Sequence, residues 1–289
     1  MSDLIQTFRG SVNRWECDEN DHLNVRFYAH KMYQTLQAGL VETGLVASDE
    51  VDVTEQIRSM HMRYIAEARI AAPITGFFGV VSHSQDELVV VTELRNTSSD
   101  ALMASYVFEL NIPGAESVAT VAMPEGAGSR GVPARCSAFA GYDLEGALEN
   151  GFRITGQGVV QPEECDASGR LMFYQYIGRV SDAVPNLWAG LEGEASRGEG
   201  LLGGAVLEYR TDKLGHLSLG EAFTLVSGFT GLGDKTKHLA HLSYSKRTGE
   251  CVAASEAIAI NMDLVARKAI SIPDRDRDLL KDLIVRPPS

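Results

Sequence analysis

The sequence has few cysteines, no long apolar run and no excess of basic residues. Its 289 residues hold four cysteines, none in a CxxC pair, which favours reduced thiols over a disulfide framework or a zinc site. No apolar run approaches the roughly 20 residues of a membrane-spanning helix. Residues 1–10 lack the basic and apolar regions of a secretory signal. We therefore expect a cytoplasmic protein with no membrane partner.

The charge balance excludes another class of partner. Lysine and arginine total 26 against 39 aspartates and glutamates, a formal net charge of −13. Nucleic-acid binding needs a concentrated basic face, so we expect no nucleic-acid partner. With 44% hydrophobic and 22% charged residues, the composition is that of an ordinary globular protein with one large core or two medium ones.

What the sequence does contain is a polar stretch at residues 15–28, WECDENDHLNVRFY. Asp18, His22 and Asn24 lie directly ahead of an amphipathic run that begins near Val25. Polar groups at a helix N-terminus lie beside free backbone amides and the positive end of the helix dipole, which stabilise a developing oxyanion. The stretch therefore predicts a catalytic site in outline.

A weaker copy of this stretch follows 148 residues later. The triplet ECD at 16–18 recurs at 164–166, and a leucine and a tyrosine recur at the same offset further on. In the second copy Arg170 aligns with His22, and Met172 aligns with Asn24. A repeat this long predicts two similar units of roughly 140 residues each, the second with a degenerate site.

Hydrophobic periodicity predicts the same order of elements in both copies. Each copy begins with a strand, at 7–15 and 152–160, followed by the polar turn and a helix. The first helix covers 25–42 and stops at Gly44, whereas Pro185 kinks or ends the second unless residues 186–191 continue it at an angle. Four strands then follow in each copy, near 60–66, 77–82, 88–94 and 102–108, and near 205–210, 222–229, 236–244 and 251–262.

Proline and glycine mark the expected boundaries between the parts of the chain. The expected organisation is a first unit at 1–125, a linker at 126–150 with a short helix near its end, a second unit at 151–272 and a C-terminal tail with another short helix at 273–289.

A strand, one long helix and four strands, occurring twice, resembles the hotdog fold, an α+β fold in which an antiparallel sheet wraps around a central helix. The turn is similar to the DxNxHVNNxxY motif of acyl-ACP thioesterases and to the DxDxxGHVNNxxY motif of 4-hydroxybenzoyl-CoA thioesterase-like proteins. It matches the Asp, Asn, His, Asn and Tyr of the first motif at residues 18–28. Asp21 stands where the second motif has glycine, and Val25 replaces its second Asn. We expect a tandem, or double, hotdog.

This resemblance implies hydrolysis of an acyl thioester without a cofactor or metal, with acyl-CoA the favoured substrate and acyl-ACP the alternative. Asp18 would attack the carbonyl or deprotonate a water. His22 and Asn24 would orient Asp18 or the water, with Asn20 in the same turn. The amides at 24–26 would bind the carbonyl oxygen.

In this family such sites form where two hotdog units meet, and the chains often associate into homo-oligomers. The resemblance therefore implies contributions from the second repeat, for which Glu164, Asp166 and Arg170 are the candidates. Weaker candidates for substrate binding are Tyr28, Lys235 and Lys237.

Alternative interpretations stay open. Asp18 and Asn24 are residue types that favour helix caps. Cys17 is a nucleophile only in an exposed, electropositive setting. A hotdog hydratase or dehydratase is a second enzymatic interpretation, although its usual motif has a Pro and one more residue between Asn and His, which this turn lacks. A non-catalytic acyl-CoA-binding protein is the third.

Overall fold

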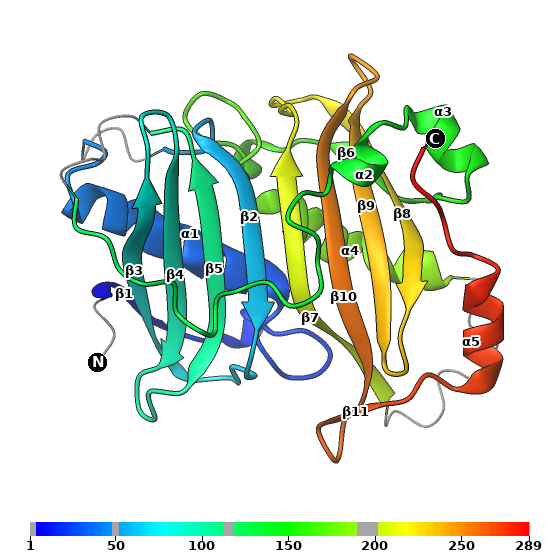
Figure 1. Cartoon of the computed structure of the whole chain (residues 1–289), viewed down its shortest axis with the longest axis horizontal. Helices are drawn as coiled ribbons and strands as arrows, with labels where there is room; N and C mark the ends of the chain where they lie inside the picture. Colours follow the sequence, from blue (N-terminus) through cyan, green and yellow to red (C-terminus); the bar gives the residue numbers. More distant parts are fainter. Residues whose placement is uncertain (1–3, 48–51, 113–117, 190–201, 289) are drawn as a thin grey trace. The chain divides into compact units, whose positions relative to one another are not determined.

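The computed structural model describes residues 4–47, 52–112, 118–189 and 202–288 (Figure 1). The chain forms two compact units. Unit 1 comprises residues 1–130 together with 166–168 and 172–178, and unit 2 comprises 131–165, 169–171 and 179–289. Within the described ranges, no helix is both long enough and apolar enough to cross a membrane.

Unit 1 is an antiparallel sheet with one long helix, α1 (Val25–Glu42), packed on one face (Figure 1). The helix and its stop at Gly44, where φ is +70°, are confirmed, as are the four strands after it. The order of neighbouring strands is β1 (Ile5–Ser11), β3 (Pro73–His83), β4 (Leu88–Asn96), β5 (Leu102–Leu110) and β2 (Ile57–Tyr64).

The first strand ends earlier than its pattern predicts. β1 stops at Ser11, and η1 (Arg14–Glu16) is a turn of 3-10 helix, so the expected strand to Trp15 is wrong. The Glu16 side chain turns back to accept a hydrogen bond from the Asn13 amide at 2.8 Å. A side chain that binds the backbone three residues earlier closes a turn and draws the chain out of the sheet.

A close approach between α1 and the sheet fixes the core of unit 1. Met32, Leu36 and Leu40 recur every four residues on α1 and are fully buried. A methyl group at Gly39 would lie 2.1 Å from Cγ of Phe78, so only glycine fits at this point of the helix.

We therefore expect Gly39→Ala to lower the free energy of unfolding by about 1–3 kcal/mol, because overpacking outweighs the roughly 1 kcal/mol gain in helix propensity. Urea denaturation measures the change. Gly128→Ala is the control, because no atom lies within 4 Å of a methyl group there. Equal stability of both variants would contradict this account of the close approach.

Unit 2 has the same strand order at its own positions along the chain. Its helix α4 (Gln175–Trp188) continues past Pro185, which is the second of the two alternatives expected at that proline. The four strands expected after the helix are confirmed. Listed in the direction used for unit 1, neighbouring strands are β6 (Arg153–Val159), β8 (Ala222–Leu232), β9 (Thr236–Ser245), β10 (Cys251–Asp263) and β7 (Leu202–Lys213). A short strand, β11 (Lys268–Ile270), also pairs with β10.

The segment between the repeats is folded along much of its length. From Gly131 onward it belongs to unit 2. Its helices α2 (Ser137–Ala140) and α3 (Leu144–Glu149) place Phe139 and Ala147 in an apolar cluster with Phe152 and Leu242. The short helices expected near the end of the linker and in the tail are confirmed as α3 and α5 (Asp274–Lys281).

Buried carboxylates of unit 2 hold the start of this segment against β7. Glu208 accepts a hydrogen bond from the Gly131 amide at 2.9 Å, and Asp212 accepts one from the Cys136 amide at 2.6 Å. On the neighbouring strand, Oε1 of Glu256 is buried without a hydrogen-bond partner among the described residues. Burial, followed by the charge of Asp212, raises the pKa of Glu256 to about 7.

Glu256 should therefore make unit 2 less stable at alkaline pH. Its raised pKa means that the neutral carboxyl stabilises the folded state fully below the ordinary pKa of 4.5, and this stabilisation is lost as the pH rises through about 7. We expect Glu256→Gln to increase the stability of unit 2 at pH 8 relative to pH 4 by about 1–3 kcal/mol compared with wild type. Urea denaturation at both pH values measures this, with the exposed Glu250→Gln as control. Parallel pH dependence in all three proteins would contradict it.

A row of buried polar side chains crosses the sheet of unit 2. Strand register aligns Thr211 with Ser255, Ser255 with His241, and His241 with Ser227. Hydrogen bonds join Thr211 to Ser255 at 2.9 Å, His241 to Ser227 at 2.8 Å, and Ser227 to Thr155 at 2.8 Å. Burial lowers the pKa of His241 to about 3, which keeps the imidazole neutral.

Candidate functional site

The polar turn of unit 1 is a closed loop between β1 and α1. Cys17 and Leu23 form an isolated antiparallel bridge, and the Asp18 amide donates to the His22 carbonyl at 3.0 Å. Asp21 has a φ of +57°, in the left-handed region that aspartate tolerates better than most residues. In the second copy, Gly169 occupies this position with a φ of +78°. The replacement of the family glycine by Asp21 therefore leaves the turn conformation intact.

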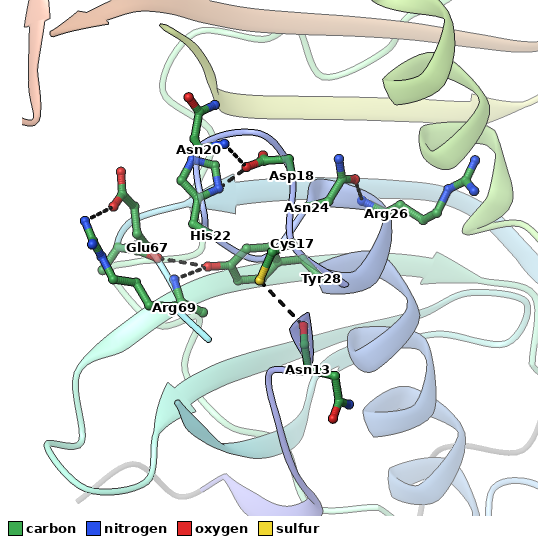
Figure 2. A network of polar contacts seen from close by, with 12 residues as sticks. Asn13, Cys17, Asp18, Asn20, His22, Asn24, Arg26, Tyr28, Glu67 and Arg69 are labelled. Carbon is green, nitrogen blue, oxygen red and sulfur yellow. Dashed lines mark hydrogen bonds and ion pairs between the residues drawn. The ribbon is translucent and has the colours of Figure 1, made fainter. Parts of the chain in front are cut away.

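The Asp18 carboxylate is the centre of the turn (Figure 2). Oδ1 accepts a hydrogen bond from the Asn20 amide at 2.9 Å, and Oδ2 lies 3.2 Å from Nδ1 of His22. The side chains of Asp18 and His22 are each 15% exposed, so both are fixed but remain accessible. The side chain of Asn20 points away from the carboxylate, so Asn20 contributes its backbone amide.

Electrostatics favour a charged imidazole beside this carboxylate. Burial opposes the imidazolium, but the hydrogen bond to Asp18 and the charge of Asp18 outweigh it, and Glu67 adds to their effect, so the pKa of His22 is raised. The pKa of Cys17 is also raised, by burial and then by Asp18 and Asp21. The Cys17 thiol donates to the Asn13 carbonyl at 3.5 Å. A thiol held neutral in this way is a poor nucleophile.

Asn24 caps α1. Its Oδ1 accepts a hydrogen bond from the Arg26 amide at 2.9 Å, and its own amide donates to the Glu16 carbonyl at 2.9 Å. The helix-cap interpretation is thus confirmed for Asn24, whereas the Asp18 carboxylate binds the turn and His22. Of the three amides expected to bind a carbonyl oxygen, those of Asn24 and Arg26 have protein acceptors. For the Val25 amide, no acceptor is found among the described residues.

A buried ion pair holds the turn against α1. Oε1 of Glu16 lies 2.7 Å from Nζ of Lys31, and the two side chains are 9% and 7% exposed. Sequence reasoning missed this pair as part of the site. The repeat contained a signal for it, because Glu164 and Arg179 recur at the same offset and also form an ion pair, in unit 2.

The second copy retains the turn but not its chemistry. Oδ1 of Asp166 accepts hydrogen bonds from the amide and hydroxyl of Ser168 at 2.9 and 2.7 Å. Arg170, at the position of His22, forms an isolated bridge with Ser218. Glu164 accepts hydrogen bonds from Arg179 and from the Gln161 amide, which accounts for its carboxylate without a substrate.

The remaining candidates already have protein partners. Lys235 is exposed and donates to the Ala269 carbonyl at 3.2 Å. Lys237 is buried, donates to Asn261 and lies 4.3 Å from the ring centroid of Trp188. Tyr28 is buried beneath the turn, and its hydroxyl binds main-chain groups of Ala66 and Ala68. The structure thus gathers Asp18, Asn20, His22 and Asn24 in one turn of unit 1, whereas both lysines belong to unit 2.

The cysteines and the potential metal ligands of the chain lie apart from one another or unpaired in the described parts. In the parts of the chain that the structure describes, no three His, Cys, Asp or Glu residues gather as metal ligands. All four cysteines lie in those parts and are free thiols.

Solved structures match the fold of the chain. A 12:0-ACP thioesterase from Umbellularia californica is 8% identical, with a TM-score of 0.64 over 89% of this chain and 94% of that one. A Lactobacillus plantarum protein provisionally named an oleoyl thioesterase is 11% identical, with a TM-score of 0.63 over 90% and 96%. An acyl-ACP thioesterase from Bacteroides thetaiotaomicron is 8% identical, with a TM-score of 0.60 over 89% and 97%. The chain has their fold.

This likeness and the antiparallel sheets confirm the expected hotdog fold. No protein-family model matches the sequence, and no curated protein matches it.

The buried pair leads to a stability prediction. Lys31→Met leaves the Glu16 carboxylate buried without its partner, so we expect a loss of about 3–5 kcal/mol in the free energy of unfolding. Adding Glu16→Gln should recover most of that loss, because the uncompensated charge is removed. Chemical denaturation of the single and double variants measures both steps. A double variant no more stable than Lys31→Met would show that the pair acts by packing alone.

Proposed function

We propose that the chain hydrolyses acyl thioesters, with Asp18 as the reacting carboxylate. The observation that carries this proposal is the geometry of Asp18, which is held by the Asn20 amide and by His22 yet remains accessible beside the N-terminus of α1. A carboxylate fixed beside an imidazole and a helix N-terminus suits attack on a carbonyl or activation of a water. The fold shared with named thioesterases adds to this argument.

The reaction converts a thioester and water into a carboxylic acid and a thiol. By one route, Asp18 attacks the carbonyl carbon, the thiolate leaves, and water hydrolyses the resulting anhydride. By the other, Asp18 takes a proton from a water that attacks the carbonyl. In both, the Val25 amide is placed to donate to the carbonyl oxygen as it gains negative charge. His22, with its raised pKa, fixes the orientation of Asp18.

We also propose the tandem hotdog organisation and an acyl-CoA as the substrate. The shared strand order of the two units, and a fold likeness that spans about 90% of the chain, support the tandem organisation. The net charge of −13 favours CoA, since an acidic carrier protein approaches an acidic chain slowly. Two of the structural neighbours are named for acyl-ACP substrates, so acyl-ACP is the alternative to test.

Substitution of Asp18 tests the proposed function. We expect Asp18→Asn to reduce thiol release from acyl-CoAs by at least about 100-fold, because the amide neither attacks nor takes up a proton. Asp166→Asn is the matched control, since it changes the same atom in a turn without the imidazole. Its effect should be much smaller. Release of free thiol, measured with short, long and aromatic acyl-CoAs, gives both rates.

Each other outcome has a definite meaning. Full turnover by Asp18→Asn would remove Asp18 from the mechanism, and equal losses in both variants would show that the second turn is also required. Without thiol release from any acyl-CoA or acyl-ACP, hydration of enoyl-CoA becomes the next assay. Binding of acyl-CoA with no reaction, unchanged by Asp18→Asn, would identify a non-catalytic binding protein.

A further inference from the structure

The hydroxyl of Tyr28 is a bridge between two points of the segment that follows β2. It donates a hydrogen bond to the Ala66 carbonyl at 3.1 Å and accepts one from the Ala68 amide at 2.8 Å. The ring is 4% exposed and packs edge-on against Tyr64, with 5.4 Å between ring centroids. Both partners of the hydroxyl are main-chain groups, so Tyr28 fixes the path of residues 66–68 whatever their side chains are.

The same segment pairs with the polar turn. The Ala68 carbonyl accepts a hydrogen bond from the Leu23 amide at 2.7 Å, and His22 and Arg69 form an isolated antiparallel bridge. A continuous chain of hydrogen bonds therefore leads from the Tyr28 hydroxyl through Ala68 to Leu23, the residue after His22. Figure 2 shows Tyr28 between this segment and the turn.

The position of Tyr28 on α1 makes this bridge rigid. Its amide donates to the carbonyl of Asn24, the residue that caps the helix, at 3.2 Å. One turn of helix thus supplies both the cap beside Asp18 and the hydroxyl that holds residues 66–68. The segment also carries Glu67, which pairs with Arg69 at 3.4 Å.

We infer that Tyr28 is a positioning residue for the reaction: its hydroxyl holds residues 66–69 against the turn and so fixes His22 in register with Asp18. This inference rests on the proposed thioester hydrolysis. A small displacement of a catalytic group is enough to cost about a hundredfold in rate. The Tyr28 hydroxyl is linked through two hydrogen bonds to Leu23, the residue next to His22, so its removal should have a measurable effect. Tyr28 itself touches no reacting atom.

The charges around His22 supply a readout that a purely structural role would not change. Asp18 and Glu67 face the imidazole and raise its pKa, while Arg69 lies across the bridge from His22 and partly neutralises Glu67. A loosened segment moves His22 relative to both carboxylates. The pKa of His22 should then fall toward its ordinary value, and the limb of the pH–rate profile that reports it should move to lower pH.

Tyr28→Phe tests the inference, with Tyr33→Phe as its matched control. Tyr33 is on the same helix, is 2% exposed, and has a buried hydroxyl bonded to Thr54 at 2.9 Å, away from the turn. Both variants lose one buried hydroxyl, and Tyr28→Phe should lose more stability because it leaves two main-chain groups without their partner, whereas Tyr33→Phe leaves only the Thr54 hydroxyl. Only Tyr28→Phe should lower kcat, by about 10- to 100-fold with little change in KM, and move the His22 limb to lower pH.

An NMR titration of His22 gives a second measurement that requires no turnover. Glu67→Gln keeps the hydrogen bonds of the Tyr28 hydroxyl and removes the negative charge of residue 67 near the imidazole, so it should also lower the pKa of His22. Equal kcat in Tyr28→Phe and Tyr33→Phe, or a His22 titration that Glu67→Gln shifts and Tyr28→Phe leaves unchanged, would overturn the inference. Failure of the proposed function is distinct, because wild type would then release no thiol or Asp18→Asn would retain full turnover.

Discussion

The ion pair between Glu16 and Lys31 is the constraint on which the site depends. Two charges removed from water are favourable only when each satisfies the other, and here Glu16 also accepts a hydrogen bond from the Asn13 amide. The pair therefore ties η1 to the second turn of α1. The loop that carries Asp18 is held between these two points. Its geometry follows from a contact that takes no part in the chemistry.

The second copy has the turn and its ion pair but lacks two of the proposed reacting groups. It retains an acid–base pair in Glu164 and Arg179, the turn closed by Asp166, and a residue with positive φ at Gly169. It lacks an imidazole at position 170 and an amide side chain at position 172. The turn and its ion pair therefore form without an imidazole or an amide side chain at these positions, so they do not depend on the proposed reacting groups, which one copy carries and the other does not.

Much of the fold follows from local pattern. Period-four and period-two hydrophobicity predicted α1 and the strands after each helix, because each element buries one face. The pattern misplaced the end of β1, because Glu16 reaches back to Asn13, and it left open whether α4 ends at Pro185 or continues, as it does to Trp188. Hydrophobic periodicity does not encode the side-chain contact of Glu16.

Part of the candidate site, like part of the fold, could be predicted from the sequence. The grouping of Asp18, His22 and Asn24 in one turn follows from their spacing, whereas their roles in a reaction stay a prediction. The cap formed by Asn24 and the main-chain partners of Tyr28 were not predictable, because they depend on backbone groups. Ala66 and Ala68 lie about forty residues along the chain from Tyr28, and their side chains carry no sign of the contact. The partner of Lys31 was not predicted, although the glutamate repeated at positions 16 and 164 indicated one.

The polar row through Thr211, His241 and Thr155 bears on the heat capacity of unfolding. In unit 1 the row that includes Thr92 also holds Met62, Tyr106 and Phe78, and Thr92 contacts Met32 of α1. Unfolding exposes less apolar surface from the row in unit 2, and apolar exposure is what raises the heat capacity. The row in unit 2 therefore contributes less than its counterpart in unit 1 to the curvature of stability with temperature.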